Sequence, residues 1–127
     1  MSELIPWDSH VIDLDDAMVR VLGRKDLYKK WLDSFFSDKD DSFGLINKSV
    51  ETKDYDTAHR VMHKLKGTAG NLSVITVRDQ AKLIDEKIQK TADLGELADD
   101  FAKLRECFDF AKRMYECNLN VITGYGE

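Results

Sequence analysis

Four residues within two helical turns carry groups suited to phosphoryl transfer: His63, Lys66, Gly67 and Gly70. A neutral imidazole has an unprotonated ring nitrogen near neutral pH, so His63 is a candidate nucleophile. Lys66 follows three residues later, where a helix brings its ammonium group within reach of an anion on the His63 ring. Because phosphoryl transfer depends mainly on positioning and charge stabilisation, these groups predict that His63 accepts a phosphoryl group and hands it on.

The helical projection predicts that His63 faces solvent. At about 100° per residue, the apolar residues around it gather on one face of the helix. His63 falls about 140° from the middle of that face. This argues against a buried structural histidine. The neighbouring residues must then distinguish a functional histidine from a surface histidine without a function. The apolar face consists of Ala58, Val61, Met62, Leu65, Ala69 and Leu72.

The two glycines lie on the same side of the helix as His63. Each costs a helix interior about 0.8–1 kcal/mol relative to alanine, so bare backbone must serve another purpose there. We interpret Gly67 and Gly70 as exposing the ring and letting a partner approach closely; the alternative is close packing against a neighbouring helix. Lys64 is a possible supporting residue. His59, one turn before His63, either shapes the surroundings of the ring or is an ordinary polar helix residue.

The elements that position these residues are predicted to be helices, because apolar residues recur at helical spacing and no stretch shows sustained strand-like alternation. Gly23 is suited to end the first helix and Asp41 to cap the third. The predicted fold is all-α: an antiparallel four-helix bundle, with additional short N-terminal helices over one end. It forms a single domain over residues 1–127, irregular to about residue 13. Helices are expected over 14–22, around 27–36, 42–52, about 54–72, 75–90 and after Gly95.

Apolar stripes predict the buried side of the other helices. The last helix has the longest stripe, at alternating steps of four and three residues, as in long antiparallel helices that pack at shallow angles. The predicted inner residues are Leu27, Trp31, Leu32, Phe35 and Phe36 in the second helix, Phe43, Ile46 and Val50 in the third, Val77, Ala81, Ile84 and Ile88 after the His63 helix, and Leu97, Phe101, Leu104, Phe108, Ala111 and Tyr115 in the last.

Composition excludes several classes of function. A net charge of -5 lacks the basic excess that nucleic-acid binding requires. No apolar run approaches the roughly 20 residues of a membrane span, and the start has no signal-peptide pattern, so neither a membrane partner nor export is expected and the protein is predicted to be cytoplasmic. Cys107 and Cys117 lie ten apart in one predicted helix. They are therefore expected to be reduced thiols.

The run from His63 to Ser73 resembles the histidine-containing phosphotransfer (HPt) domains of multistep phosphorelays. Their signature is close to H-x-L-K-G-x-A-G-x-L-G, and HKLKGTAGNLS matches all but the last position, where Ser73 replaces glycine at the junction with the next helix. The resemblance extends over most of the chain, upstream through Leu14–Ala17, Gly23, Leu27, Tyr28, Leu32 and Phe35 and downstream through Ala81, Leu83 and Glu86.

The resemblance implies a four-helix bundle in which His63 exchanges a phosphoryl group with receiver-domain aspartates, with Lys66 and Gly67 in supporting roles. The expected partners are receiver domains of response regulators and of a hybrid sensor histidine kinase. No intrinsic cofactor is expected, and Mg²⁺ would belong to the receiver. No kinase ATP-binding motif is present, so the chain would be a phosphorelay intermediate without kinase activity of its own. It would be either a free-standing shuttle, which the initiating methionine favours, or the terminal domain of a hybrid kinase.

Two rival functions are open to test. His59 and His63 are spaced as in zinc-binding helices, but a zinc site needs a third or fourth protein ligand, His10 and the cysteines lie far away in sequence, and Lys66 would repel a cation. No metal site is therefore expected. The other rival is a bundle that only docks to partners and has lost phosphotransfer; such a domain would have little reason to retain His63, Lys66 and Gly67 together.

Overall fold

In the computed structural model, which describes residues 4–127, the chain folds into helices joined by short connections, and the described residues contain no strand beyond an isolated bridge between Ile12 and Val74. The prediction of an all-α fold is confirmed. The helices are α1 (Leu14–Arg20), α2 (Lys25–Ser37), α3 (Ser42–Thr52), α4 (Tyr55–Asn71), α5 (Ile75–Ile88), the 3-10 helix η1 (Leu94–Leu97), α6 (Ala98–Cys117) and α7 (Leu119–Thr123).

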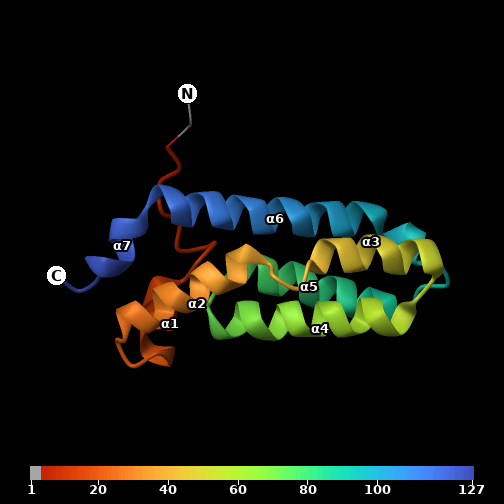
Figure 1. Ribbon diagram of the computed structural model, residues 1–127, viewed down its shortest axis with the longest axis horizontal. Coiled ribbons are helices and arrows are strands. Elements are labelled where there is room, and N and C mark those ends of the chain that lie inside the picture. The colour runs from red at the N-terminus through yellow and green to blue at the C-terminus, as the bar shows by residue number, and fades with distance from the viewer. Residues whose placement is uncertain (1–3) are drawn as a thin grey trace.

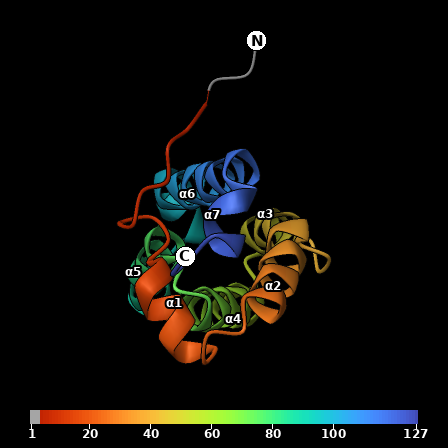
Figure 2. The ribbon, with the colours of Figure 1, turned by 90° about the vertical axis from the view of Figure 1, so that its left-hand side faces the viewer.

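The helices form a bundle with four edges. Helices α4, α5 and α6 form three of them, and α2 and α3 follow each other along the fourth (Figures 1 and 2). The expected four-helix bundle is therefore present, with one edge built from two consecutive helices. The short helix α1 covers one end, as predicted, and α7 lies at the same end and packs against α2 (Figure 1).

The core follows the predicted stripes except on α2 and at the end of α3, where Ser49 is buried and Val50 is only partly buried. The apolar faces predicted for α4 and for the last helix are buried throughout, and so are Val77, Ala81, Ile84 and Ile88 of α5. On α2 the buried residues are Tyr28, Leu32 and Phe36, which lie at steps of four, and of these Leu32 and Phe36 were predicted. Trp31, predicted to face inward, is 44% exposed. The inner face of α2 is therefore narrower than predicted and includes Tyr28, because the apolar residues of this helix are too numerous to define a single stripe.

Two helix ends show how the chain turns. Asp41 caps α3 as predicted, since its carboxylate accepts a hydrogen bond from the Gly44 amide. Helix α1 ends earlier than predicted, at Arg20, because Leu22 and Gly23 both take positive φ angles of 55° and 73°. The Gly23 amide then donates to the Met18 carbonyl at 2.8 Å, which closes the helix.

The junction after α4 explains why the family pattern has glycine where this chain has Ser73. Ser73 has φ 58°, in the left-handed region that favours glycine. Its amide donates to the Gly70 carbonyl, and the amide of Val74 donates to the Ala69 carbonyl, the two bonds of a Schellman motif. The serine hydroxyl is buried and donates to Asp16 Oδ2 at 2.6 Å. The junction therefore keeps its geometry, and a side-chain hydrogen bond offsets the cost of the backbone conformation.

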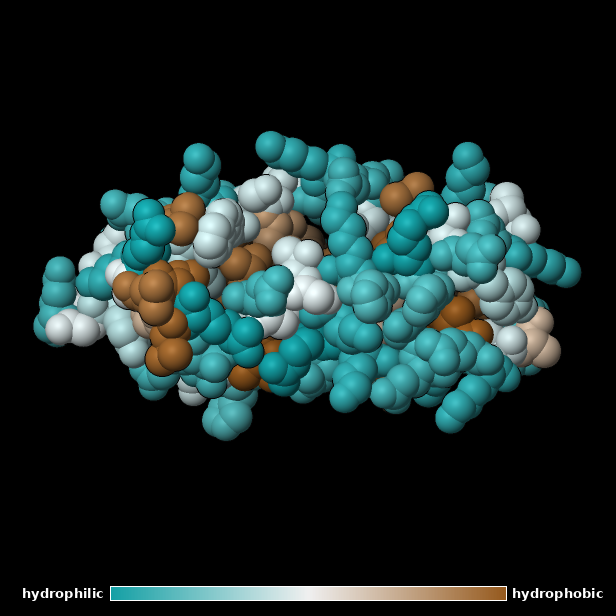
Figure 3. Space-filling model, turned by 90° about the horizontal axis from the view of Figure 1, so that it is seen from below, coloured by the Kyte–Doolittle hydropathy of each residue, from teal (hydrophilic) through white to brown (hydrophobic). Residues whose placement is uncertain are grey.

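Figure 3 shows the face that carries α4, whose surface is largely hydrophilic, with hydrophobic side chains gathered toward the end that carries α1. Exposed apolar residues at that end include Val19, 74% exposed, and Leu22, 87% exposed. Among the helices of residues 4–127, none combines the length and the apolar character that crossing a membrane requires.

Candidate functional site

His63 lies near the middle of α4 and is exposed, as the helical projection predicts. The opposite face of the helix is anchored in the core by Met62 and Ala69, both fully buried. Among the described residues, none forms a hydrogen bond or ion pair with the His63 ring; its neighbour is the His59 ring, 5.9 Å away between centroids and tilted by 36°. Both ring nitrogens of His63 are therefore available to an incoming group.

His59 and Lys66, which flank His63 along α4, converge on one carboxylate from the neighbouring helix α5. His59 Nδ1 lies 2.5 Å from Asp85 Oδ1, and Lys66 Nζ lies 3.7 Å from Asp85 Oδ2. The Asp85 side chain is only 6% exposed, whereas those of Lys66 and His59 are 32% and 48% exposed. The buried carboxylate of Asp85 thus lies beneath two basic side chains, which separate it from solvent.

Gly67 and Gly70 differ in their surroundings. A Cβ atom added at Gly67 would meet no heavy atom within 4 Å, so no packing contact within the described chain requires glycine there. A Cβ at Gly70 would lie 3.5 Å from the Arg78 side chain, an ordinary contact. The alternative that the glycines allow close helix packing therefore finds no support at either position. Gly67 leaves bare, open backbone one turn from His63, whereas the space above Gly70 already has a side chain beside it.

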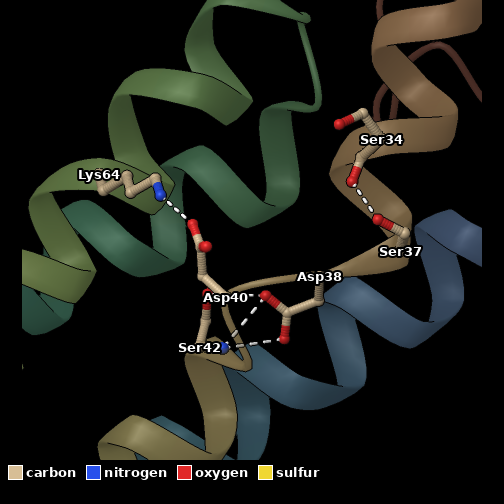
Figure 4. Close-up of polar contacts among 6 residues, drawn as sticks. All are labelled: Ser34, Ser37, Asp38, Asp40, Ser42 and Lys64. Carbon is tan, nitrogen blue, oxygen red and sulfur yellow. Dashed lines mark hydrogen bonds and ion pairs between the residues drawn. The ribbon is translucent and has the colours of Figure 1, made fainter.

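Lys64 points away from this group. Its ammonium forms an ion pair with Asp40 in the connection between α2 and α3, where the Asp38 carboxylate accepts a hydrogen bond from the backbone amide of Ser42, the first residue of α3 (Figure 4). The hydrogen bond and the positive charge of Lys64 lower the pKa of the Asp40 carboxyl. Lys64 therefore contacts the α2–α3 connection, and the lysine associated with Asp85 and His59 is Lys66.

The spacing of His59 and His63 raised the possibility of a metal site. Across residues 4–127, the structure brings together no group of three or more His, Cys, Asp or Glu side chains that could hold a metal ion. His59 Nδ1 is already engaged by Asp85. The cysteines both lie on α6, ten residues apart, too far along one helix for a disulfide between them.

Asp85 is the site residue that the sequence reasoning missed. It lies within the buried stripe of α5, four residues after Ala81 and three before Ile88. An acidic residue on an apolar helix face must find a basic or hydrogen-bonding partner when the face is buried. This break in the stripe was the available signal, but the sequence does not show which basic residue of another helix it meets.

A groove of about 510 Å³ lies between α2 and α4, on the side of α4 that carries Lys64. Trp31 lines it from α2, and Leu65 and Thr68 line it from α4. The exposed Trp31 side chain therefore lines a groove beside α4.

Comparison with known proteins places this geometry in a family. No curated protein matches the chain significantly. Among solved structures, the Hpt domain of a sensor hybrid histidine kinase from Shewanella has the same fold, with a TM-score of 0.67 over 94% of this chain and 100% of that one, at 16% sequence identity. The Hpt domain family matches residues 30–113. Hpt domains take part in histidine phosphotransfer within phosphorelays and interact with receiver domains. With two thirds of its length matched, the chain belongs to the Hpt domain family.

Proposed function

We propose that His63 accepts a phosphoryl group from the aspartyl phosphate of one receiver domain and passes it to the aspartate of another. The donor would be the receiver of a hybrid sensor histidine kinase and the acceptor that of a response regulator, in the cytoplasm. The observation that carries the proposal is an exposed His63 ring without hydrogen-bond partners among the described residues, one turn from the bare backbone of Gly67.

The chemistry requires little from this chain. A ring nitrogen of His63 attacks the phosphorus, the bond from phosphorus to the aspartate oxygen breaks, and the carboxylate leaves with its electron pair. The reverse sequence transfers the group to the next aspartate. Mg²⁺ held by the receiver would neutralise charge on the transferring oxygens.

Lys66 supplies the positive charge on the side of this chain. Its ammonium lies 3.7 Å from Asp85, longer than a direct hydrogen bond, and its side chain is partly exposed. A flexible four-carbon stem can therefore swing the ammonium toward a phosphoryl group on His63, three residues away. We expect Lys66→Ala to slow transfer in both directions without unfolding the bundle; unchanged rates in both directions would make Lys66 a bystander.

The test is phosphoryl transfer from a purified receiver domain that has been phosphorylated beforehand in Mg²⁺. The wild type should acquire an acid-labile, base-stable label. His63→Gln should abolish the label and keep the helical circular dichroism, because the side chain is exposed. His10→Gln is the matched control, since His10 is also exposed but precedes α1; it should label normally.

The competing function is a bundle that docks to receivers without accepting phosphate. That reading predicts binding of a receiver with no label on the wild type from any receiver, including the one bound. Equal labelling of wild type and His63→Gln would assign the phosphoryl group to another residue. Timed transfer against the receiver domains of the source organism would then identify donor and acceptor by kinetic preference.

A further inference from the structure

Asp85 is the charged member of a small group of buried polar side chains. Ser49, Ser73 and Gln80, the other buried polar residues described, are neutral. Charged side chains are almost never this buried unless they are paired. Packing alone therefore does not explain why a charged residue lies on the side of α5 that faces α4.

The carboxylate of Asp85 is shared between two basic residues of α4. Oδ1 takes the short contact with His59 Nδ1, and Oδ2 faces the ammonium of Lys66 at 3.7 Å. Because Asp85 is an acceptor, His59 Nδ1 is the donor in this pair. The contact with His59 holds the carboxylate in place. The longer contact attracts the Lys66 ammonium without fixing its position.

We propose that Asp85 competes with the phosphoryl group on His63 for the Lys66 ammonium, and thereby lowers the stability of the phosphorylated form and favours transfer onward. This inference rests on the proposed function of His63. Asp85 is on this view a positioning residue, which acts through Lys66 and through its own charge.

Phosphorylation places a second anion within reach of Lys66, and one ammonium cannot neutralise both anions at close range. The buried carboxylate also faces the new negative charge through a medium less polar than water, where charges interact more strongly. Both effects raise the free energy of phospho-His63 relative to that of the unmodified protein. Removing the charge of Asp85 should therefore stabilise phospho-His63.

The test is the equilibrium constant for transfer from a phosphorylated receiver domain to this protein. Asp85→Asn keeps the shape of the side chain and an oxygen that accepts the His59 hydrogen bond, but removes the charge. We expect it to raise the equilibrium constant about three- to tenfold, as for a charge interaction at a partly exposed site. Asp109→Asn on α6 makes the same change of net charge on the helix opposite α4 and should leave the constant unchanged (Figure 2).

A double-mutant cycle separates competition for Lys66 from a general effect on the fold. In a Lys66→Met background, the effect of Asp85→Asn should fall to less than half, because no shared ammonium remains to be released. An undiminished effect would overturn the competition for Lys66. An unchanged or lowered constant for Asp85→Asn, with the wild type labelled normally, would overturn the proposal and leave the function of His63 standing. No labelling of the wild type would overturn both.

A measurement on the wild type makes the test independent of whether Asp85→Asn folds. The carboxyl carbon of Asp85, observed by NMR with ¹³C-labelled aspartate, should shift when His63 is phosphorylated by the receiver. Lys66→Met should remove most of that shift, since the shift reports the departure of the ammonium. A carboxyl resonance that does not respond to phosphorylation would overturn the proposal.

Discussion

Gly67→Ala should make the domain more stable and a poorer phosphoryl carrier at the same time. Alanine is favoured over glycine in a helix interior by about 0.8–1 kcal/mol. The added methyl group meets no heavy atom within 4 Å, so no clash reduces that gain. In a complex, however, the same methyl group stands one turn from His63, where the receiver must approach. Overpacking a close contact by a methyl group costs about 1–3 kcal/mol, which slows transfer roughly five- to 150-fold.

The assay combines urea unfolding with transfer from a phosphorylated receiver, and Gly70→Ala is the matched comparison. Both substitutions add one methyl group to α4, but the one at Gly70 would lie beside the Arg78 side chain, so it adds less new surface. Gly70→Ala should show a similar gain in stability with a smaller loss of transfer rate. Destabilisation by Gly67→Ala would show that the fold needs glycine there. A stabilised variant with the transfer rate of the wild type would refute the interpretation that bare backbone serves the partner.

Three further predictions concern the surroundings of the site. Ser73→Ala keeps the left-handed backbone and loses the hydrogen bond to Asp16, so it should lower the free energy of unfolding by about 1–2 kcal/mol. Ser73→Gly should be about 1 kcal/mol more stable than the alanine variant, because glycine tolerates the left-handed backbone. A glycine variant less stable than the alanine variant would contradict the strain at φ 58°. The hydrogen bond from Ser73, and then that from Arg20, lower the pKa of the Asp16 carboxyl. The contribution of Asp16 to stability is therefore fully present above the pKa of this carboxyl in the unfolded chain, and it is lost as the pH falls through its lower pKa in the folded protein. Acid titrations should show a shallower loss of the free energy of unfolding below about pH 4 in Asp16→Asn than in the wild type. Trp31→Ala should weaken receiver binding by roughly tenfold or more in calorimetry while the midpoint of urea unfolding changes little. The reason is that a half-exposed aromatic side chain beside α4 is typical of a residue that contacts a partner. An unchanged affinity would show that the groove is not part of the interface.

The sequence predicts the fold well wherever a helix has one clear apolar stripe. The stripe predicted for the last helix, from Leu97 at the end of η1 to Tyr115 in α6, is buried throughout, and the projection of α4 places His63 outside correctly. On α2 the prediction was right for Leu32 and Phe36 and wrong for Trp31, because adjacent apolar residues allow more than one inner face. Only the contacts with the other helices decide between them, and they bury Leu32 and leave Trp31 open.

The candidate site shows the same division between local and tertiary information. The spacing of His63, Lys66 and Gly67 is local, so a helix projection suffices to group them. Asp85 reaches the site only because α4 and α5 pack against each other, and nothing in the sequence specifies their register. Ser73 departs from the family glycine, and only the structure shows that its hydroxyl reaches Asp16 in α1.

The proposed mechanism requires that the phosphoryl group on His63 be held, but not held tightly, because a carrier must release to the acceptor what it takes from the donor. A single ammonium of Lys66 neutralises only part of the charge of a phosphoryl dianion, and Asp85 draws on the same ammonium from below. The two residues should therefore move the transfer equilibrium in opposite directions: Lys66→Met should lower the fraction of phospho-His63 and Asp85→Asn should raise it. Shifts of the same sign would show that Asp85 supports Lys66 in binding phosphate and does not compete with it.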